Sequence, residues 1–425
     1  MKISAPKGTR DILPAEVARW RHAEQVFAQV CALHGYEEIR IPTFEATELF
    51  QRGVGDTTDI VQKEMYTFED KGGRSMTLRP EGTAGVVRSY IENGMGSLPS
   101  PVRLFYNITA FRYENVQKGR YREFHQLGAE AFGSNGPLVD AELIGMLALY
   151  FERMGIQDAK LRVNSIGCPV CRAKYNQLLQ AYFEPHIQGM CEDCRGRIGR
   201  NPLRILDCKV ERDHALAADA PRLLDHLCAD CQTHFDGLLR ALVAQGTEYT
   251  IDNGIVRGLD YYTRTVFEFV SASFQSLGGT ICGGGRYDGL VEEIGGAPTP
   301  GVGFAMGLER LLLELEARDI VLPDTPPMDL YLAPMGDMAA TYAASLVARL
   351  RRAGVRAETD LCGRSLKAQL KFAGKRGVRF AAVIGDSELS TGQVKLRRMR
   401  DGTEESVSLS ELETDATARM AAFGD

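Results

Sequence analysis

A proline-rich segment, LPDTPPMD at residues 322–329, separates two parts of the chain that differ in their strand and helix patterns. Before it, short strand candidates follow one another with few helices between them. After it, strands and helices alternate. Neighbouring strands joined by short turns favour antiparallel pairing, whereas strand–helix–strand alternation favours parallel pairing. The sequence therefore predicts two domains with different sheets, joined at this segment.

The first part predicts an α+β fold, a mainly antiparallel sheet flanked by helices. Residues 166–245 differ from their surroundings: they are cysteine-rich and helical, and they are expected to form an insertion between sheet segments 1–165 and 246–322. The expected strands are 36–42, 75–78, 102–113, 123–132, 161–165, 266–269 and 278–282. The expected helices are 15–34, 82–93 and 140–153, with 172–183 and 222–244 inside the insertion.

The second part, residues 328–425, predicts a separate α/β domain. The expected strands are 329–334, 355–359 and 380–384, and the expected helices are 338–353 and 365–376. A hairpin follows, with Asp401-Gly402 at its turn.

Composition narrows the class of protein. The chain has 425 residues, 44% of them hydrophobic, which is enough for two or three cores. The net charge of −6 means that any nucleic-acid binding must be local. The N-terminus does not resemble a signal peptide, and no apolar run approaches the roughly 18 residues needed to cross a bilayer. We therefore expect a cytoplasmic protein without membrane contact.

The run RGLDYYTRTVFEF at residues 257–269 carries the most chemistry. Thr263 to Phe269 alternates like a strand, and the residues before it supply a guanidinium, a carboxylate and two phenols. Such a strand would bring fixed polar groups into an interior. An ordinary charged strand start would also account for the composition.

A nucleotide-binding loop of the usual glycine-rich type is missing from the sequence. There is no GxxxxGK[ST], and GVGFAMG (301–307) has Met306 where the dinucleotide pattern needs its last glycine. Instead, Arg112 precedes a basic loop containing Lys118, Arg120 and Arg122. Two strands joined by such a loop could hold a polyphosphate through guanidinium contacts, or could be an exposed, solvated hairpin.

Five segments together resemble the histidyl-tRNA synthetases, a class II aminoacyl-tRNA synthetase family. RGLDYY (257–262) and GGTICGGGRYDGL (278–290) resemble the two histidyl motifs, and the resemblance covers nearly the whole chain. Residues 111–130 resemble motif 2, and 301–313 resemble motif 3. Residues 34–45, centred on Pro42, resemble motif 1, which implies a homodimer; a strand-edge proline would also explain Pro42.

The resemblance implies a role for individual residues. Arg257 and Arg112 would be catalytic, with Arg257 stabilising charge that grows on the α-phosphate. Histidine would be bound by Glu81, Thr83, Arg112, Gln126, Glu130, Arg257, Tyr261 and Tyr262, and the Mg²⁺ complex of ATP by Arg112, Glu114, Arg120 and Arg310. Glycines of 278–290 would let backbone approach the ligand closely. Taken alone, Glu81 and Thr83 could be helix caps, and Arg310 could simply begin an amphipathic helix.

Three Cys-x-x-Cys pairs lie in the insertion. Cys168 and Cys171 precede Cys191 and Cys194 by nineteen intervening residues, which fits a zinc spacing. These four are the expected ligands of a structural zinc ion. Cys208, Cys228 and Cys231 are alternatives, because spacing does not decide which four meet. Free reduced thiols are an equal expectation, and disulfides a lesser one.

A basic stretch lies in the last domain. Residues 349–379 contain ten Lys or Arg and two acids, a balance of +8. This concentration suits phosphate contacts, although a solvated helix face is the simpler interpretation. The domain resembles the anticodon-binding domain of class II synthetases, which favours RNA. Expected tRNA contacts are Gln117, Arg364, Lys367 and Lys371.

The resulting prediction is ATP-dependent ligation of L-histidine to tRNA(His) through a histidyl adenylate. A synthetase-like regulatory subunit of ATP phosphoribosyltransferase is the alternative. That family typically lacks the anticodon domain and loses the catalytic motifs, whereas both are present in this sequence. A class II ligase for another amino acid is disfavoured by the two histidyl motifs.

Overall fold

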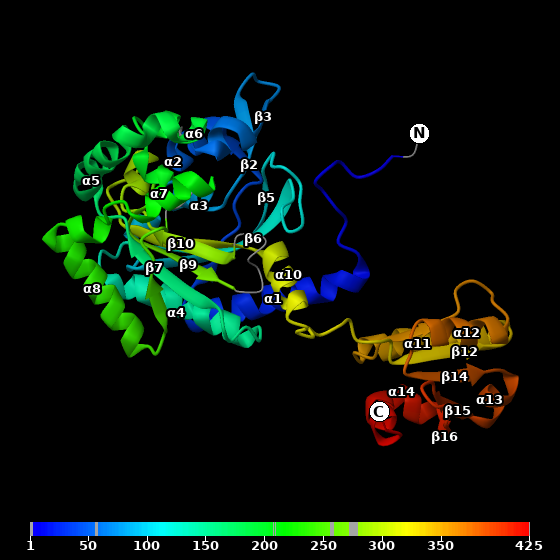
Figure 1. Ribbon diagram of the computed structural model, residues 1–425. Coiled ribbons are helices and arrows are strands. Elements are labelled where there is room, and N and C mark those ends of the chain that lie inside the picture. The colour runs from blue at the N-terminus through cyan, green and yellow to red at the C-terminus, as the bar shows by residue number, and fades with distance from the viewer. Residues whose placement is uncertain are drawn as a thin grey trace. The chain divides into compact units, whose positions relative to one another are not determined.

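The computed structural model describes residues 3–55, 58–206, 208, 210–255, 259–271 and 279–424. The chain forms two compact units, Met1–Pro323 and Asp324–Asp425 (Figure 1). The boundary falls within the proline-rich segment. None of the helices in the described ranges has the length and apolarity needed to cross a membrane.

An eight-stranded sheet organises the first unit. Its strands, in spatial order, are β1 (Glu37–Glu38), β5 (Val102–Phe111), β6 (Glu123–Phe132), β11 (Gly301–Gly307), β10 (Thr280–Arg286), β9 (Thr263–Val270), β7 (Lys160–Ser165) and β8 (Tyr249–Ile251). The six central strands pair antiparallel, and only the edge strands β1 and β8 pair parallel within the described part. The predicted mainly antiparallel sheet is confirmed. A smaller antiparallel sheet consists of β2 (Phe44–Ala46), β4 (Ser75–Leu78) and β3 (Tyr66–Glu69).

Helices cover both faces of the large sheet (Figure 1). On one face lie α1 (Pro14–Leu33), α4 (Pro137–Arg153), α8 (Ala229–Ala244) and α10 (Leu308–Ala317). α1 places Trp20, Ala23, Phe27 and Val30 against the sheet at helical spacing. The other face carries α3 (Thr83–Glu92), which packs with α2 (Thr47–Val54) and α9 (Leu290–Glu293). Short helical turns are η1 (Ile60–Glu64) and η2 (Met95–Ser97).

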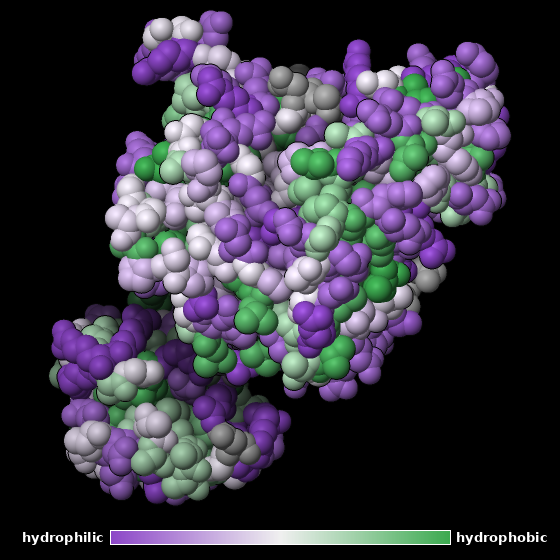
Figure 2. All heavy atoms as spheres, turned by 90° about the vertical axis from the view of Figure 1, so that its left-hand side faces the viewer, coloured by the Kyte–Doolittle hydropathy of each residue, from purple (hydrophilic) through white to green (hydrophobic). Residues whose placement is uncertain are grey.

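The insertion folds onto the α3 side of the sheet and shares its core. It contains α5 (Pro169–Phe183), η3 (Glu184–Gly189), α6 (Glu192–Arg197), η4 (Pro202–Ile205), α7 (Glu211–Ala218) and η5 (Leu223–His226), and leads into α8. Figure 2 shows polar and apolar residues interspersed on the side that bears α5 and α8. The larger apolar residues of the insertion, such as Phe183 and Ile205, are turned inward.

Several sequence-based boundaries were wrong; the strand expected at 278–282, for example, runs from Thr280 to Arg286. The expected strand 36–42 is reduced to Glu37–Glu38, because Pro42 cannot donate a hydrogen bond and the Ile41 and Pro42 carbonyls accept from Arg79 instead. The expected helix 222–244 is broken: Leu227 and Cys228 are extended, and Cys228 is the N-cap of α8.

The second unit is a five-stranded sheet with its own core. Its strand order is β13 (Ala357–Thr359), β12 (Leu330–Pro334), β14 (Phe380–Ile384), β15 (Gln393–Arg398) and β16 (Glu404–Ser408). The helices are α11 (Asp337–Arg352), α12 (Leu366–Lys375), α13 (Asp386–Thr391) and α14 (Leu409–Ala422). The predicted hairpin is present, with Gly402 at φ 77° in its turn.

Candidate active site

Glu130 lies at the centre of a buried polar cluster on the α3 face of the large sheet. Its carboxylate accepts hydrogen bonds from Thr83 Oγ1 (2.7 Å), from the Tyr106 hydroxyl (3.1 Å) and from the Tyr287 hydroxyl. Burial raises the pKa of Glu130 to about 8, against the opposing effect of these hydroxyl donors. The three donors come from α3, from β5 and from the residue after β10. The site is therefore assembled from distant parts of the chain.

Glu81 and Thr83 sit where α3 begins. The buried Glu81 carboxylate accepts from the backbone N–H groups of Thr83 (2.7 Å) and Ala84 (2.8 Å). Glu81 thus caps the helix as the capping interpretation expects, and this bonding also fixes its direction. Burial raises the pKa of Glu81. The two predicted residues reach the same cluster through the Thr83–Glu130 bond.

Gln126 and the two tyrosines complete the cluster. Gln126 precedes Glu130 by four residues on β6, so both point to one face of the sheet. Gln126 Oε1 is buried and has no hydrogen-bond partner among the residues that the structure describes. The Tyr261 ring lies 5.6 Å from the Tyr287 ring and 4.7 Å from the Tyr262 ring. The structure therefore brings the predicted histidine-binding residues 81, 83, 126, 130, 261 and 262 into one buried region.

Two glycines make room for this cluster. A Cβ at Gly303, on β11, would overlap the Glu130 carboxylate, so only glycine fits beside it. A Cβ at Gly285 would lie 2.9 Å from the Tyr262 ring. The glycine-rich strand β10 thus accommodates a neighbouring side chain of the cluster.

The predicted nucleotide-binding residues gather at the far end of β5 and β6. Arg112 Nε donates to the Pro80 carbonyl at 2.8 Å, and its guanidinium lies 5.3 Å from the Phe124 ring centre. Glu114 pairs with Arg112 (3.9 Å) and Arg120 (3.3 Å). Burial lowers the pKa of Arg310, and the nearby positive charge of Arg120 lowers it further. GVGFAMG forms the strand β11, after which Arg310 follows in the first turn of α10.

A contact that the sequence pattern did not reveal orients Arg310. Glu309 is buried, and its carboxylate accepts from the backbone N–H of His125 at 3.0 Å and lies 2.9 Å from His125 Nδ1. This contact joins the start of α10 to β6. Nothing in the local sequence marked Tyr106 or Glu309 as residues of the site. Tyr287 and Arg286 could have been found, because they stand inside the glycine-rich motif at 278–290.

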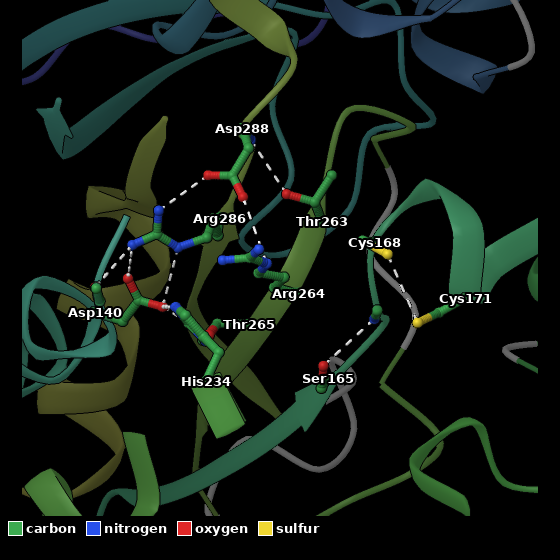
Figure 3. Close-up of polar contacts among 12 residues, drawn as sticks. Asp140, Ser165, Cys168, Cys171, His234, Thr263, Arg264, Thr265, Arg286 and Asp288 are labelled. Atoms are coloured by element: carbon green, nitrogen blue, oxygen red, sulfur yellow. Dashed lines mark hydrogen bonds and ion pairs between the residues drawn. The ribbon is translucent and has the colours of Figure 1, made fainter. Parts of the chain in front are cut away.

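Arg286 forms a second buried network behind the cluster (Figure 3). Its guanidinium pairs with Asp140 of α4 and with Asp288 (2.9 Å), and both of its terminal nitrogens also donate to backbone carbonyls. Asp140 accepts from Thr265 Oγ1 at 2.7 Å and lies 3.5 Å from His234 Nε2. The network ties β9 and β10 to α4 and α8.

The remaining predicted residues lie elsewhere. Arg257 is outside the described residues. Gln117 is exposed in the turn between β5 and β6. Lys367 and Lys371 are exposed on α12 of the second unit, while Arg364 pairs with Asp360 at 2.7 Å and lies 4.5 Å from the Phe372 ring centre.

The predicted zinc ligands do not form one group. The structure gathers an outer cluster of Cys168, Cys171, Cys228 and Cys231, and an inner cluster of Cys191, Cys194, Cys208 and Asp213. The sequence-based quartet of 168, 171, 191 and 194 is therefore corrected. The spacing rule joined neighbouring pairs, whereas the fold brings the start of α5 to the start of α8.

Comparisons with known proteins agree with this geometry. The family model described as histidyl-tRNA synthetase matches residues 8–173 and 200–311, and the anticodon binding domain model matches 329–418. A histidine–tRNA ligase of Acetivibrio thermocellus is 59% identical over 97% of this chain and 99% of its own. One of Desulforamulus reducens is 53% identical over 97% and 98%.

A solved apo structure of histidyl-tRNA synthetase from S. aureus is 41% identical, with a TM-score of 0.83 over 97% of this chain and 99% of the other. Both the sequence match and the structural match extend over nearly the full length. The chain therefore belongs to the histidyl-tRNA synthetase family.

Proposed function

We propose that the protein activates L-histidine with ATP and transfers the histidyl group to tRNA(His). The observation that carries this proposal is the buried cluster around Glu130. Imidazole has two ring nitrogens, so a site that selects it needs a hydrogen-bonding group at each. Glu130 supplies an acceptor held by three hydroxyls, and the tyrosines 261 and 262 supply phenols beside it.

Other predicted residues would bind the ammonium and carboxylate groups of the histidine substrate. Glu81 would bind the ammonium group with Thr83 beside it, and Arg112 would pair with the substrate carboxylate. Gln126 Oε1, which lacks a partner in the described part of the chain, would also gain a donor from the substrate. A buried polar atom without a partner is costly, so ligand binding would relieve that cost.

Adenylation needs no protein nucleophile. The histidine carboxylate oxygen attacks the α-phosphorus of ATP, pyrophosphate leaves, and histidyl adenylate forms. A ribose hydroxyl at the tRNA 3′ end then attacks the adenylate carbonyl and AMP leaves. Arg112, Arg120 and Arg310 would hold the phosphates, with Glu114 pairing with Arg112 and Arg120 and so offsetting the repulsion between them, and Mg²⁺ would enter with the nucleotide. Arg257 would stabilise charge on the α-phosphate.

The partners follow from the same assignment. The second unit would bind the tRNA anticodon region, with Gln117 contacting tRNA near the catalytic cluster. We also expect the protein to be cytoplasmic. We expect a homodimer because the segment around Pro42 resembles motif 1, and light scattering of the purified protein would measure its mass. A structural zinc ion in the insertion would take no part in adenylation, since neither cysteine cluster includes a residue of the Glu130 cluster or the arginine set.

ATP–pyrophosphate exchange across a panel of amino acids tests the proposal. Exchange should require histidine and no other amino acid. Exchange that required a different amino acid would identify the protein as a class II ligase for that amino acid. No exchange with any amino acid, in a folded protein, would favour the regulatory-subunit alternative.

A further inference from the structure

The insertion brings its cysteines together in two separate groups of four ligand atoms. Within each group, the outer cluster and the inner cluster, the ligand atoms all lie within 4.8 Å of one another. The chain has ten cysteines, and those of the two clusters are free thiols. Seven of them belong to these two clusters, which is a dense use of thiols for a segment of about eighty residues.

The outer cluster is built by two helix starts. Cys168 is the N-cap of α5 and Cys228 is the N-cap of α8, so each Cys-x-x-Cys pair places two sulfurs on the first turn of a long helix. Cys168 Sγ lies 3.7 Å from Cys171 Sγ, and the Cys228 backbone N–H donates to Cys171 Sγ at 3.1 Å.

The inner cluster combines three sulfurs with one carboxylate. Cys191 Sγ lies 3.8 Å from Cys208 Sγ, and Cys208 Sγ lies 3.7 Å from Asp213 Oδ2. The Asp213 side chain is 1% exposed, and its Oδ2 accepts from the Cys191 backbone N–H at 2.9 Å. The other oxygen, Asp213 Oδ1, lies 3.5 Å from Arg212 Nε, so Oδ2 is the carboxylate oxygen that faces the sulfurs.

These separations match tetrahedral metal coordination. Ligands about 2.3 Å from a tetrahedral zinc ion have sulfurs about 3.8 Å apart, and a carboxylate oxygen about 2.1 Å from it stands about 3.6 Å from each sulfur. Disulfide sulfurs would be bonded at about 2.05 Å. The geometry points to two structural zinc sites in the insertion, a Cys₄ site at the outer cluster and a Cys₃Asp site at the inner cluster.

Both sites flank contacts between the insertion and the histidyl motif. Arg172, next to Cys171, donates to the Tyr262 carbonyl at 2.8 Å. Asn201, between Cys194 and Cys208, donates to Asp260 Oδ1 at 3.1 Å, and Arg204 lies 3.8 Å from the same oxygen. These groups surround a crevice of about 170 Å³. The zinc sites therefore stabilise the part of the insertion that positions residues 260–262.

Metal content measured by mass spectrometry tests the sites. The full-length protein, purified without chelator and under reducing conditions, should contain two zinc ions per chain. Cys231→Ser should remove one, Asp213→Asn should remove one, and the combination should remove both. Cys362→Ser is the matched control, since this exposed thiol belongs to neither cluster, and it should retain two.

Two further measurements do not depend on variants that lose a metal. Cobalt substitution of the wild-type protein should give thiolate charge-transfer absorption, and Asp213→Cys should retain two metals and increase that absorption by adding a fourth sulfur to the inner site. Wild-type protein without metal and with seven reactive insertion thiols would overturn the proposal. Two retained zinc ions in Asp213→Asn would overturn the inner site.

The inference that the insertion positions residues 260–262 rests on the proposed function, and it is tested separately by histidine kinetics. Arg172→Met should retain two zinc ions while raising the KM for histidine several-fold with little change in kcat. An unchanged KM would contradict the positioning role alone. A protein with two zinc ions and no histidine-dependent exchange would contradict the proposed function and leave the zinc sites standing.

Discussion

Glu130 accepts three hydroxyl hydrogen bonds in a fully buried position, and its protonation should therefore control the stability of the ligand-free protein. Burial raises its folded-state pKa from 4.5 to about 8. Between those values the folded protein holds a proton that the unfolded chain has lost. Stability from this group is complete below about pH 4.5 and is lost as pH rises toward about 8.

Glu130→Gln removes this titration. As pH rises through the window, the free energy of unfolding of the wild-type protein should fall relative to that of the variant, with a limiting slope of about 1.4 kcal/mol per pH unit. The thermal midpoint of the wild-type protein should fall with it. Taking the difference between the two proteins cancels the other titrating groups. Parallel midpoint curves across the window would show that Glu130 keeps an ordinary pKa.

Gly303→Ala tests the packing against Glu130. The added methyl group would overlap the carboxylate, so the strand or Glu130 must shift. We expect a loss of roughly 1–3 kcal/mol in stability and at least a tenfold rise in the KM for histidine. Gly307→Ala on the same strand is the control, because its Cβ would lie at an ordinary 3.7 Å from the Arg310 side chain. Equal histidine KM values for both variants would contradict the placement of Glu130 in the histidine pocket.

At the residue scale, the sequence predicted members of the buried polar cluster but not the groups that hold them. Glu81, Thr83 and Glu130 stand in recognisable motifs and meet in the structure, and Gln126 lies on the same face of β6 as Glu130. Tyr106 could not be predicted, because its role depends on β5 lying beside β6, and a strand pattern does not name its neighbour.

The Arg286–Asp140 pair joins β10 to α4, and its loss should lower the stability of the whole sheet domain. Both side chains are fully buried. Asp140→Asn leaves the buried guanidinium with Asp288 as its remaining carboxylate partner in the described structure and should destabilise the protein by about 3 kcal/mol, whereas Asp140→Leu with Arg286→Met should recover part of that loss. Glu48→Ala, which breaks the exposed pair with Arg52, should change stability by about 0–1 kcal/mol. Thermal unfolding measures all three, and similar midpoints for Asp140→Asn and Glu48→Ala would contradict the bracing role.

At the element scale, long periodic segments were predictable and short or interrupted ones were not. The ends of β5, β6 and α4 all lie within three residues of the predicted ends. The helix break at Cys228 was missed because residues 222–244 keep an apolar helical pattern through it, while the N-cap position of Cys228 depends on its partner cluster. Tertiary contacts overrode the local pattern there.

The second unit has its own core, so the first should remain folded without it. Truncation after Pro323 should leave histidine-dependent pyrophosphate exchange largely intact and should sharply reduce tRNA charging, because phosphate contacts dominate RNA affinity. Light scattering and circular dichroism would control for assembly and folding. Equal charging with and without residues 324–425 would mean that this unit does not bind tRNA.

The charge available to RNA in that unit is smaller than the sequence suggests. Asp329 pairs with Arg356 and Arg379, and Glu413 pairs with Arg349, so two acids outside residues 349–379 lower the balance from +8 to +6. Lys367→Ala with Lys371→Ala, two exposed residues one helical turn apart, should reduce the salt dependence of tRNA binding by up to about 1.4 in log–log slope. An unchanged slope would remove α12 from the interface.

The order of the cysteines along the chain matters when the protein is made. The inner cluster lies wholly between the two halves of the outer one. During synthesis, Cys168, Cys171, Cys191 and Cys194 all emerge before Cys208, Asp213 or Cys228, and domains generally fold from the N-terminal side as they appear. A nascent chain thus offers a complete four-thiol set in a zinc spacing before either native set exists. A metal ion held by this early set would have to change partners, first as Cys208 and Asp213 emerge to join Cys191 and Cys194, and then as Cys228 and Cys231 emerge to join Cys168 and Cys171.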